Sequence, residues 1–141
     1  MTRRTLSFVA GCAGVLLTAR PVLAHHSFAA EFDANKPITV KGTVTKIEWS
    51  NPHAWIFIDV RQPDGKVVNW GIETGGPNAL YRRGWKKDSL HIGDEITVTG
   101  WASKDGFPSA NAKDVILPNG QKMGAASSAG APDQKDSEKR Y

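Results

Sequence analysis

Cysteine is the scarcest reactive residue in this chain, which contains a single one, Cys12. It lies in an N-terminal segment that we expect to be removed during export, and the remaining chain would then have no thiol. Disulfide bonds, a cysteine nucleophile and thiolate metal ligands are thereby excluded. Any bound metal ion has to be held by histidine, carboxylate, the amino terminus or Met123.

Long apolar runs are also missing, and the longest one belongs to a leader. The run Leu6–Leu17 is too short for a membrane-spanning helix, which needs about 20 residues. It follows a basic pair, Arg3-Arg4, and precedes the small-residue sequence Val22-Leu23-Ala24, so the three parts of a secretory signal are present. We therefore expect residues 1–24 to be a signal peptide, cleaved after Ala24, which delivers a protein without a transmembrane segment to the periplasm.

Two alternative signals overlap this leader. Thr2-Arg3-Arg4-Thr5-Leu6 is similar to a twin-arginine signal, which exports proteins after folding, often with a cofactor bound. Val9-Ala10-Gly11-Cys12 is similar to a lipobox with Cys12 as the lipid anchor. Cleavage there would leave the apolar Val15-Leu16-Leu17 beyond the cut.

Excess charge is small as well. The net charge of +4 falls to about +1 when Arg3, Arg4 and Arg20 leave with the leader, because fifteen basic and fourteen acidic residues remain. Such a balanced chain has no electrostatic footprint for nucleic acid, so we expect no nucleic-acid partner. The length permits one domain of roughly 100 residues.

Strand patterns dominate what remains. Alternating apolar residues bounded by turn formers predict strands at 38–49, 54–60, 66–73, 96–101 and 112–117, with a short helix at 78–84. The apolar parity shifts between Val44 and Ile47 in the first strand, which predicts a β-bulge. In the second strand Ile56, Ile58 and Val60 share the core-facing side.

Three strands, a helix and two more strands follow the order of an OB-fold, a five-stranded Greek-key barrel. Gly93 and Asp94 support this, since a tight turn into a closing strand favours those residue types. We predict an all-β, OB-fold-like barrel with one short helix over residues 38–123, an N-terminal arm at 25–37 and a disordered tail at 124–141. A small open β-sandwich is the competing architecture.

Three stretches carry a resemblance to a known family. They are His25-His26-Ser27-Phe28-Ala29-Ala30-Glu31-Phe32-Asp33, the segment from Gly42-Thr43-Val44 to Asn51-Pro52-His53-Ala54, and Gly100-Trp101. Together they resemble a family of small secreted bacterial proteins that carry a single domain of unknown function. The resemblance covers residues 25–117 and implies a periplasmic setting, but it implies no activity.

Histidines are the first candidates for chemistry. Cleavage after Ala24 would place the α-amine and the ring of His25 beside the ring of His26, and imidazole with amine favours Cu(II) over other divalent metals. His53 lies at the mouth of a hairpin that the arm can reach, and His91, Glu31 or Asp33 would complete a four-coordinate site. Alternatively, His25 and His26 are polar residues of an unliganded arm, and His53 and His91 are turn and surface residues.

Aromatic residues offer a second kind of site. Trp55 and Phe57 share a strand face with His53, opposite the predicted core face, and the corresponding strands of OB-folds bind oligosaccharides or oligonucleotides. Trp49 and Trp101 lie near strand ends. We expect either a saccharide or another small organic ligand on these rings, or a cover formed by the arm or the tail.

Enzyme signatures are absent from the sequence, and the carboxylates Glu48, Asp59 and Glu73 belong to no recognisable catalytic pattern. The first hypothesis is a periplasmic, non-enzymatic binding protein that holds copper through His25, His26 and His53. The second is a non-catalytic module for a saccharide or other small organic ligand. A copper redox enzyme is the third alternative, and the sequence does not indicate the oligomeric state.

Overall fold

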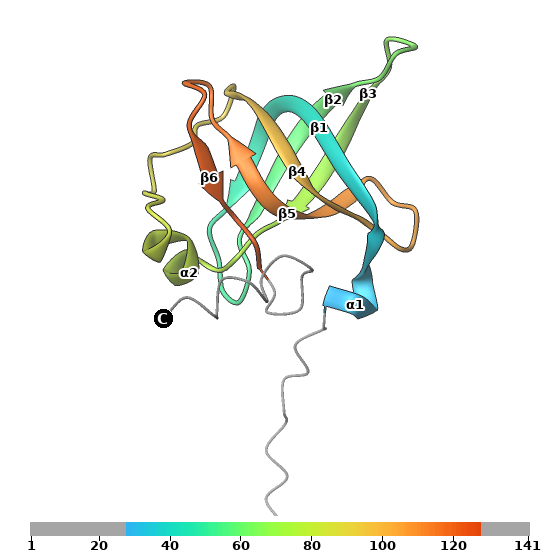
Figure 1. Ribbon diagram of the computed structural model, residues 1–141. Helices are drawn as coiled ribbons and strands as arrows, with labels where there is room; N and C mark the ends of the chain where they lie inside the picture. The colour runs from blue at the N-terminus through green and yellow to red at the C-terminus, as the bar shows by residue number, and fades with distance from the viewer. Residues whose placement is uncertain (1–27, 128–141) are drawn as a thin grey trace, which may run out of the picture.

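The computed structural model describes residues 28–127, so the expected signal peptide, His25, His26 and residues 128–141 lie outside the described part. Eight elements follow one another (Figure 1): α1 (Phe28–Glu31), β1 (Phe32–Glu48), β2 (Trp55–Arg61), β3 (Val67–Glu73), α2 (Pro77–Arg82), β4 (Glu95–Ser103), β5 (Ser109–Ile116) and β6 (Lys122–Gly124). No helix among residues 28–127 is long and apolar enough to cross a membrane.

The strands form one six-stranded sheet in the order β3-β2-β1-β4-β5-β6. All neighbours in this order are antiparallel, and a parallel pairing of β3 with β5 closes the sheet into a ring. The prediction of a mostly antiparallel β fold with a short helix between the third and fourth strands is confirmed. The count of five strands is wrong, because the three-residue β6 has too short an apolar pattern to be recognised in the sequence.

The first strand is 17 residues long and bends so that it pairs with both β2 and β4. Its register with β2 shifts between Val44 and Lys46, which confirms the predicted bulge. The strand begins six residues earlier than expected, at Phe32, where that residue pairs with Ser103 of β4. Part of the predicted irregular arm is therefore a strand.

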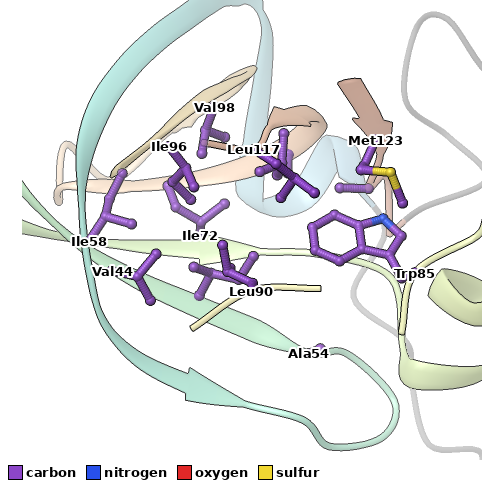
Figure 2. Close-up of a cluster of buried hydrophobic side chains, with 14 of the residues drawn as sticks. Val44, Ala54, Ile58, Ile72, Trp85, Leu90, Ile96, Val98, Leu117 and Met123 are labelled. Atoms are coloured by element: carbon purple, nitrogen blue, oxygen red, sulfur yellow. The ribbon is translucent and has the colours of Figure 1, made fainter. Parts of the chain in front are cut away.

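The main core lies inside the closed sheet (Figure 2). Ile56, Ile58 and Val60 of β2 all belong to it, as the alternation predicts. Trp85 and Met123 lie next to each other at one end of the cluster, and the Trp85 indole N–H donates to the Gly124 carbonyl at 2.8 Å.

A second, smaller cluster consists of Phe28, Phe32 and Trp101. Phe28 packs edge-on against Trp101, with ring centroids 5.3 Å apart and planes at 85°. The backbone N–H of Lys104 donates to the Glu31 carbonyl at 2.9 Å, and its ammonium group donates to the Ala29 carbonyl. These contacts hold α1, whose four residues are too few to form a stable helix alone.

The expectation of a disordered tail from residue 124 is wrong for its first four residues. Ala125 is completely buried; its N–H donates to the Lys113 carbonyl at 2.8 Å and its carbonyl accepts from Gly75 at 2.9 Å. Small residues with no apolar period can still be ordered when backbone hydrogen bonds anchor them. Residues 128–141 lie outside the described part.

We predict that Gly100→Ala destabilises the domain, because β4 and β5 approach each other most closely there. A Cβ atom at residue 100 would lie 2.0 Å from the Asn111 carbonyl oxygen, which belongs to the backbone and cannot rotate away. The free energy of unfolding should fall by about 2–3 kcal/mol in urea titrations.

Gly71→Ala is the matched control, since Gly71 is also a strand glycine but its added Cβ would meet only ordinary ring contacts at 3.6 Å. Its free energy of unfolding should change by less than about 1 kcal/mol. Equal effects of the two substitutions would contradict the close approach at Gly100.

Candidate functional site

The backbone around His53 is held from both sides. His53 follows a turn that contains a cis Asn51–Pro52 peptide bond, and a Cβ at Gly76 would lie 2.5 Å from the Pro52 carbonyl oxygen. On the other side, the Ala54 carbonyl accepts hydrogen bonds from the Thr74 backbone N–H at 2.9 Å and from its hydroxyl at 3.1 Å. The position of His53 is thus set by β2, β3 and the loop before α2.

The His53 ring bonds a buried carboxylate. Its Nδ1 lies in a short hydrogen bond with Oε1 of Glu73, whose side chain is only 5% exposed, while the His53 side chain is 24% exposed. An ionised carboxylate only accepts hydrogen bonds, so this contact favours a proton on Nδ1, and in the neutral ring Nε2 then has the lone pair. No group of residues 28–127 forms a hydrogen bond with Nε2.

Glu73 is held by donors from other segments as well. The same Oε1 accepts from the Ser127 hydroxyl at 2.9 Å and from the Asn111 amide at 3.3 Å, and that amide also donates to Ser127. Asn111 is fully buried, and its Oδ1 has no hydrogen-bond partner among the described residues. His53, Glu73, Asn111 and Ser127 thus form a hydrogen-bonded polar cluster at the edge of the apolar core.

Sequence reasoning predicted His53 but assigned no role to Glu73. The register of the β2–β3 hairpin would have predicted their contact, since Trp55 pairs with Glu73 and His53 lies two residues before Trp55. Diagonal neighbours in an antiparallel pair lie within reach of long side chains. The contributions of Asn111 and Ser127 come from the closure of the sheet and have no such local signal.

Trp55 and Phe57 form an aromatic face on the outside of β2, as the alternation predicts. Their rings are stacked, with centroids 6.4 Å apart and planes at 22°, and the Lys46 ammonium lies 5.2 Å from the Phe57 ring. Gly71 pairs with Phe57 and has no side chain to cover the rings. Both rings remain partly accessible.

The other two tryptophan candidates have packing partners of their own. Trp101 is 6% exposed beneath Phe28, and the Trp49 indole donates to the Tyr81 hydroxyl at 2.9 Å. Within residues 28–127, no ring contact joins either of them to Trp55 or Phe57. Trp49 and Trp101 therefore contribute to the packing of the domain, and their role in ligand binding stays a prediction.

His91 occupies a turn away from this cluster. Its backbone N–H donates to Oδ2 of Asp94 at 2.8 Å, and its Nδ1 lies 3.7 Å from the same oxygen. Residues 28–127 contain no group of three or more His, Cys, Asp or Glu side chains arranged to hold a metal ion. Among the described residues, Glu73 is the one potential metal ligand that contacts the His53 ring.

The N-terminal helix lies close to Trp55. Ala30, Glu31 and Phe32 line a cavity of about 340 Å³ together with Trp55, Ser103, Lys104, Asp105 and Ser109. The cluster of Phe28, Phe32 and Trp101 thus brings the start of the described chain to the side of β2 that carries His53 and Trp55.

The fold and the site define a small closed-sheet domain at whose edge a partly exposed histidine is bonded to a buried glutamate. A family model described as a family of unknown function, DUF6152, matches residues 13–112, and the chain belongs to this family. The expected membership of a family of unknown function is thereby confirmed. No curated protein is significantly similar to the chain.

We predict that the neutral His53 ring carries its proton on Nδ1, because Glu73 holds that nitrogen. Two-dimensional ¹H–¹⁵N NMR of the imidazole nitrogens distinguishes the two tautomers. Glu73→Gln should change the His53 pattern and leave that of the exposed His91 unchanged. A His53 ring protonated on Nε2, with a bare Nδ1, would contradict the assignment.

Proposed function

We propose that this protein binds a copper ion in the periplasm through the His25 amine and ring, the His26 ring and Nε2 of His53. The observation that carries the proposal is the hydrogen bond from His53 Nδ1 to the buried Glu73 carboxylate. Metal-binding histidines almost always donate their second ring N–H to a carboxylate, carbonyl or water, which orients the ring and raises the basicity of the other nitrogen.

The chemistry of the donors favours copper. An amine and three imidazoles are nitrogen ligands, for which Cu(II) has the highest affinity among the divalent first-row metals. The proposal requires export and cleavage after Ala24, because only then does His25 carry a free α-amine.

The position of α1 supports the same ligand set. His25 and His26 precede Phe28 by three and two residues, and a chain of three residues spans at most about 10 Å. Phe28 is anchored on Trp101, and α1 shares a cavity with Trp55, two residues from His53. The proposal requires that the three residues ahead of Phe28 carry the His25 amine from this anchored helix to His53.

We also propose that the closed sheet is an OB-like Greek-key barrel. The strand order, the parallel pairing of β3 with β5 and the position of α2 between β3 and β4 support this assignment. The Trp55–Phe57 face then supports a second candidate function, the binding of a saccharide or similar organic ligand. The observation in its favour is the nearly parallel stack of the two partly accessible rings.

We predict that the exported, cleaved protein binds one Cu(II) ion with a dissociation constant in the nanomolar range or tighter, measured by competitive titration. His53→Ala should weaken binding by more than about a hundredfold because it removes a ligand, and Glu73→Gln by about 10–100-fold because it removes the carboxylate that orients that ligand. One extra residue ahead of His25 should abolish the tight site, since it moves the amine away.

His91→Ala is the matched control, because it removes an exposed histidine from a turn and should leave the copper affinity unchanged. Binding no tighter than that of a free peptide with the sequence of residues 25–31 would overturn the copper proposal. Titrations with soluble oligosaccharides should then decide the second candidate, for which Trp55→Ala removes the stacking surface and His53→Ala does not.

We further predict that Phe28→Ala weakens copper binding although residue 28 is no ligand. The substitution removes the ring that holds α1 on Trp101, so the amino terminus would lose its high effective concentration near His53. The dissociation constant should rise at least about tenfold. Near-ultraviolet circular dichroism of the apo-protein checks that the main core remains folded, and an unchanged copper affinity with α1 released would refute this positioning role.

A further inference from the structure

A separate cleft lies between the β2–β3 hairpin and the loop that joins β4 to β5. Its volume is about 330 Å³, at the small end of the range for ligand pockets. Apolar and aromatic side chains form most of its walls, chiefly Val68, Trp70, Phe107 and Pro108, and Lys36 and Gln62 contribute polar groups. It shares no lining residue with the cavity beside α1, apart from Ser103.

The β4–β5 loop is a rigid wall of this cleft. Oδ1 of Asp105 accepts hydrogen bonds from the Ser103 hydroxyl at 2.6 Å and the Phe107 backbone N–H at 3.0 Å, and these bonds lower the pKa of Asp105. The Pro108 carbonyl accepts from the Gly71 backbone N–H at 3.0 Å, which ties the loop to β3. At neutral pH the carboxylate is ionised and the loop is held in place before any ligand arrives.

Phe107 is exposed in spite of this order. Its side chain is 70% accessible, although the backbone on both sides of it is hydrogen-bonded. A large apolar side chain that is mostly in water contributes little to the stability of the domain, and on an ordered backbone it offers contact area to a ligand. Exposed apolar side chains beside a concave surface are typical of binding sites.

Trp70 is the second unusual residue of the cleft, after the exposed Phe107. Its indole N–H is buried and has no hydrogen-bond partner among residues 28–127. Buried indole N–H groups usually find an acceptor, because an unpaired donor costs about 1–3 kcal/mol. This N–H has no exposed surface of its own, so Trp70 offers a ligand in the cleft its aromatic ring and no hydrogen bond.

Among the described residues, Lys36 is the charged side chain that lines the cleft. The Lys36 side chain is 63% exposed, and its ammonium group lies 3.8 Å from the Asp33 carboxylate. The Gln62 amide contributes both a donor and an acceptor, the Ser103 hydroxyl donates to Asp105, and no acidic residue of the described range 28–127 lines the cleft. This balance favours an anionic, acceptor-bearing group on the ligand, and the aromatic walls favour a flat apolar body.

We propose that this cleft binds a small monocyclic aromatic carboxylate, with the ring against Trp70 and Phe107 and the carboxylate toward Lys36. The site is independent of copper and of the proposed function of His53. It also differs from the Trp55–Phe57 face, because the cleft includes neither of those residues.

The test is an NMR titration of the metal-free, full-length cleaved protein with benzoate. The indole N–H signal of Trp70, assigned by its loss in Trp70→Phe, should shift saturably with a dissociation constant in the millimolar range or tighter. Benzamide, which keeps the ring and lacks the charge, should bind several-fold more weakly. Lys36→Met should reduce the preference for benzoate over benzamide.

Phe107→Ala should weaken benzoate binding about three- to tenfold, because it removes one aromatic wall. Ile92→Ala is the matched control, since Ile92 is also 70% exposed on a loop and does not line the cleft; it should change nothing. The proposal is overturned if benzoate leaves the Trp70 signal unmoved, or if the shift persists unchanged in Phe107→Ala and Lys36→Met. The benzoate titration uses metal-free protein, so a failure of the copper proposal would not change its outcome.

Discussion

The parallel pairing of β3 with β5 is the constraint on which the rest of the structure depends. Three residue pairs form it, from Gly71–Ser109 to Glu73–Asn111, yet they join the edge strand β3 to β5, the last strand but one of an otherwise antiparallel sheet. The closure requires β1 to bend at its bulge so that it can pair with β2 and β4, and it requires a glycine at residue 100 so that β4 can approach β5. A closed sheet has an interior, and the residues of the main core fill it.

The same pairing makes the candidate site possible. It places Asn111 beside Glu73, and it buries a carboxylate that an isolated β2–β3 hairpin would leave in water. Burial of a carboxylate costs several kcal/mol unless donors surround it, and here His53, Asn111 and Ser127 supply those donors from three separate segments. The orientation of His53, on which the proposed copper site rests, is therefore a product of the whole fold.

Two apolar clusters stabilise different parts of the structure. The main core holds the closed sheet, and the cluster of Phe28, Phe32 and Trp101 holds the start of the described chain against its side. The second cluster shares no buried residue with the main core, so a substitution at Phe28 removes no side chain from that core. The Trp70 cleft uses a different part of the molecule, where the β4–β5 loop is tied to β3 at Gly71. The two proposed binding functions are therefore physically separable.

Local features could be predicted from the amino-acid sequence: the alternating strands, the bulge after Val44, the hairpin and the outward face of Trp55 and Phe57. These depend on neighbours close in the chain, where periodicity and turn preference act directly. The sequence also singled out His53 from its place at the mouth of the hairpin. The extended start of β1, the short β6 and the ordered residues 124–127 depended on backbone pairing with distant strands, which side-chain patterns do not encode. The burial of Glu73 against His53 and the lack of an acceptor for the Trp70 indole within residues 28–127 follow from the tertiary structure, because both arise where segments far apart in sequence meet.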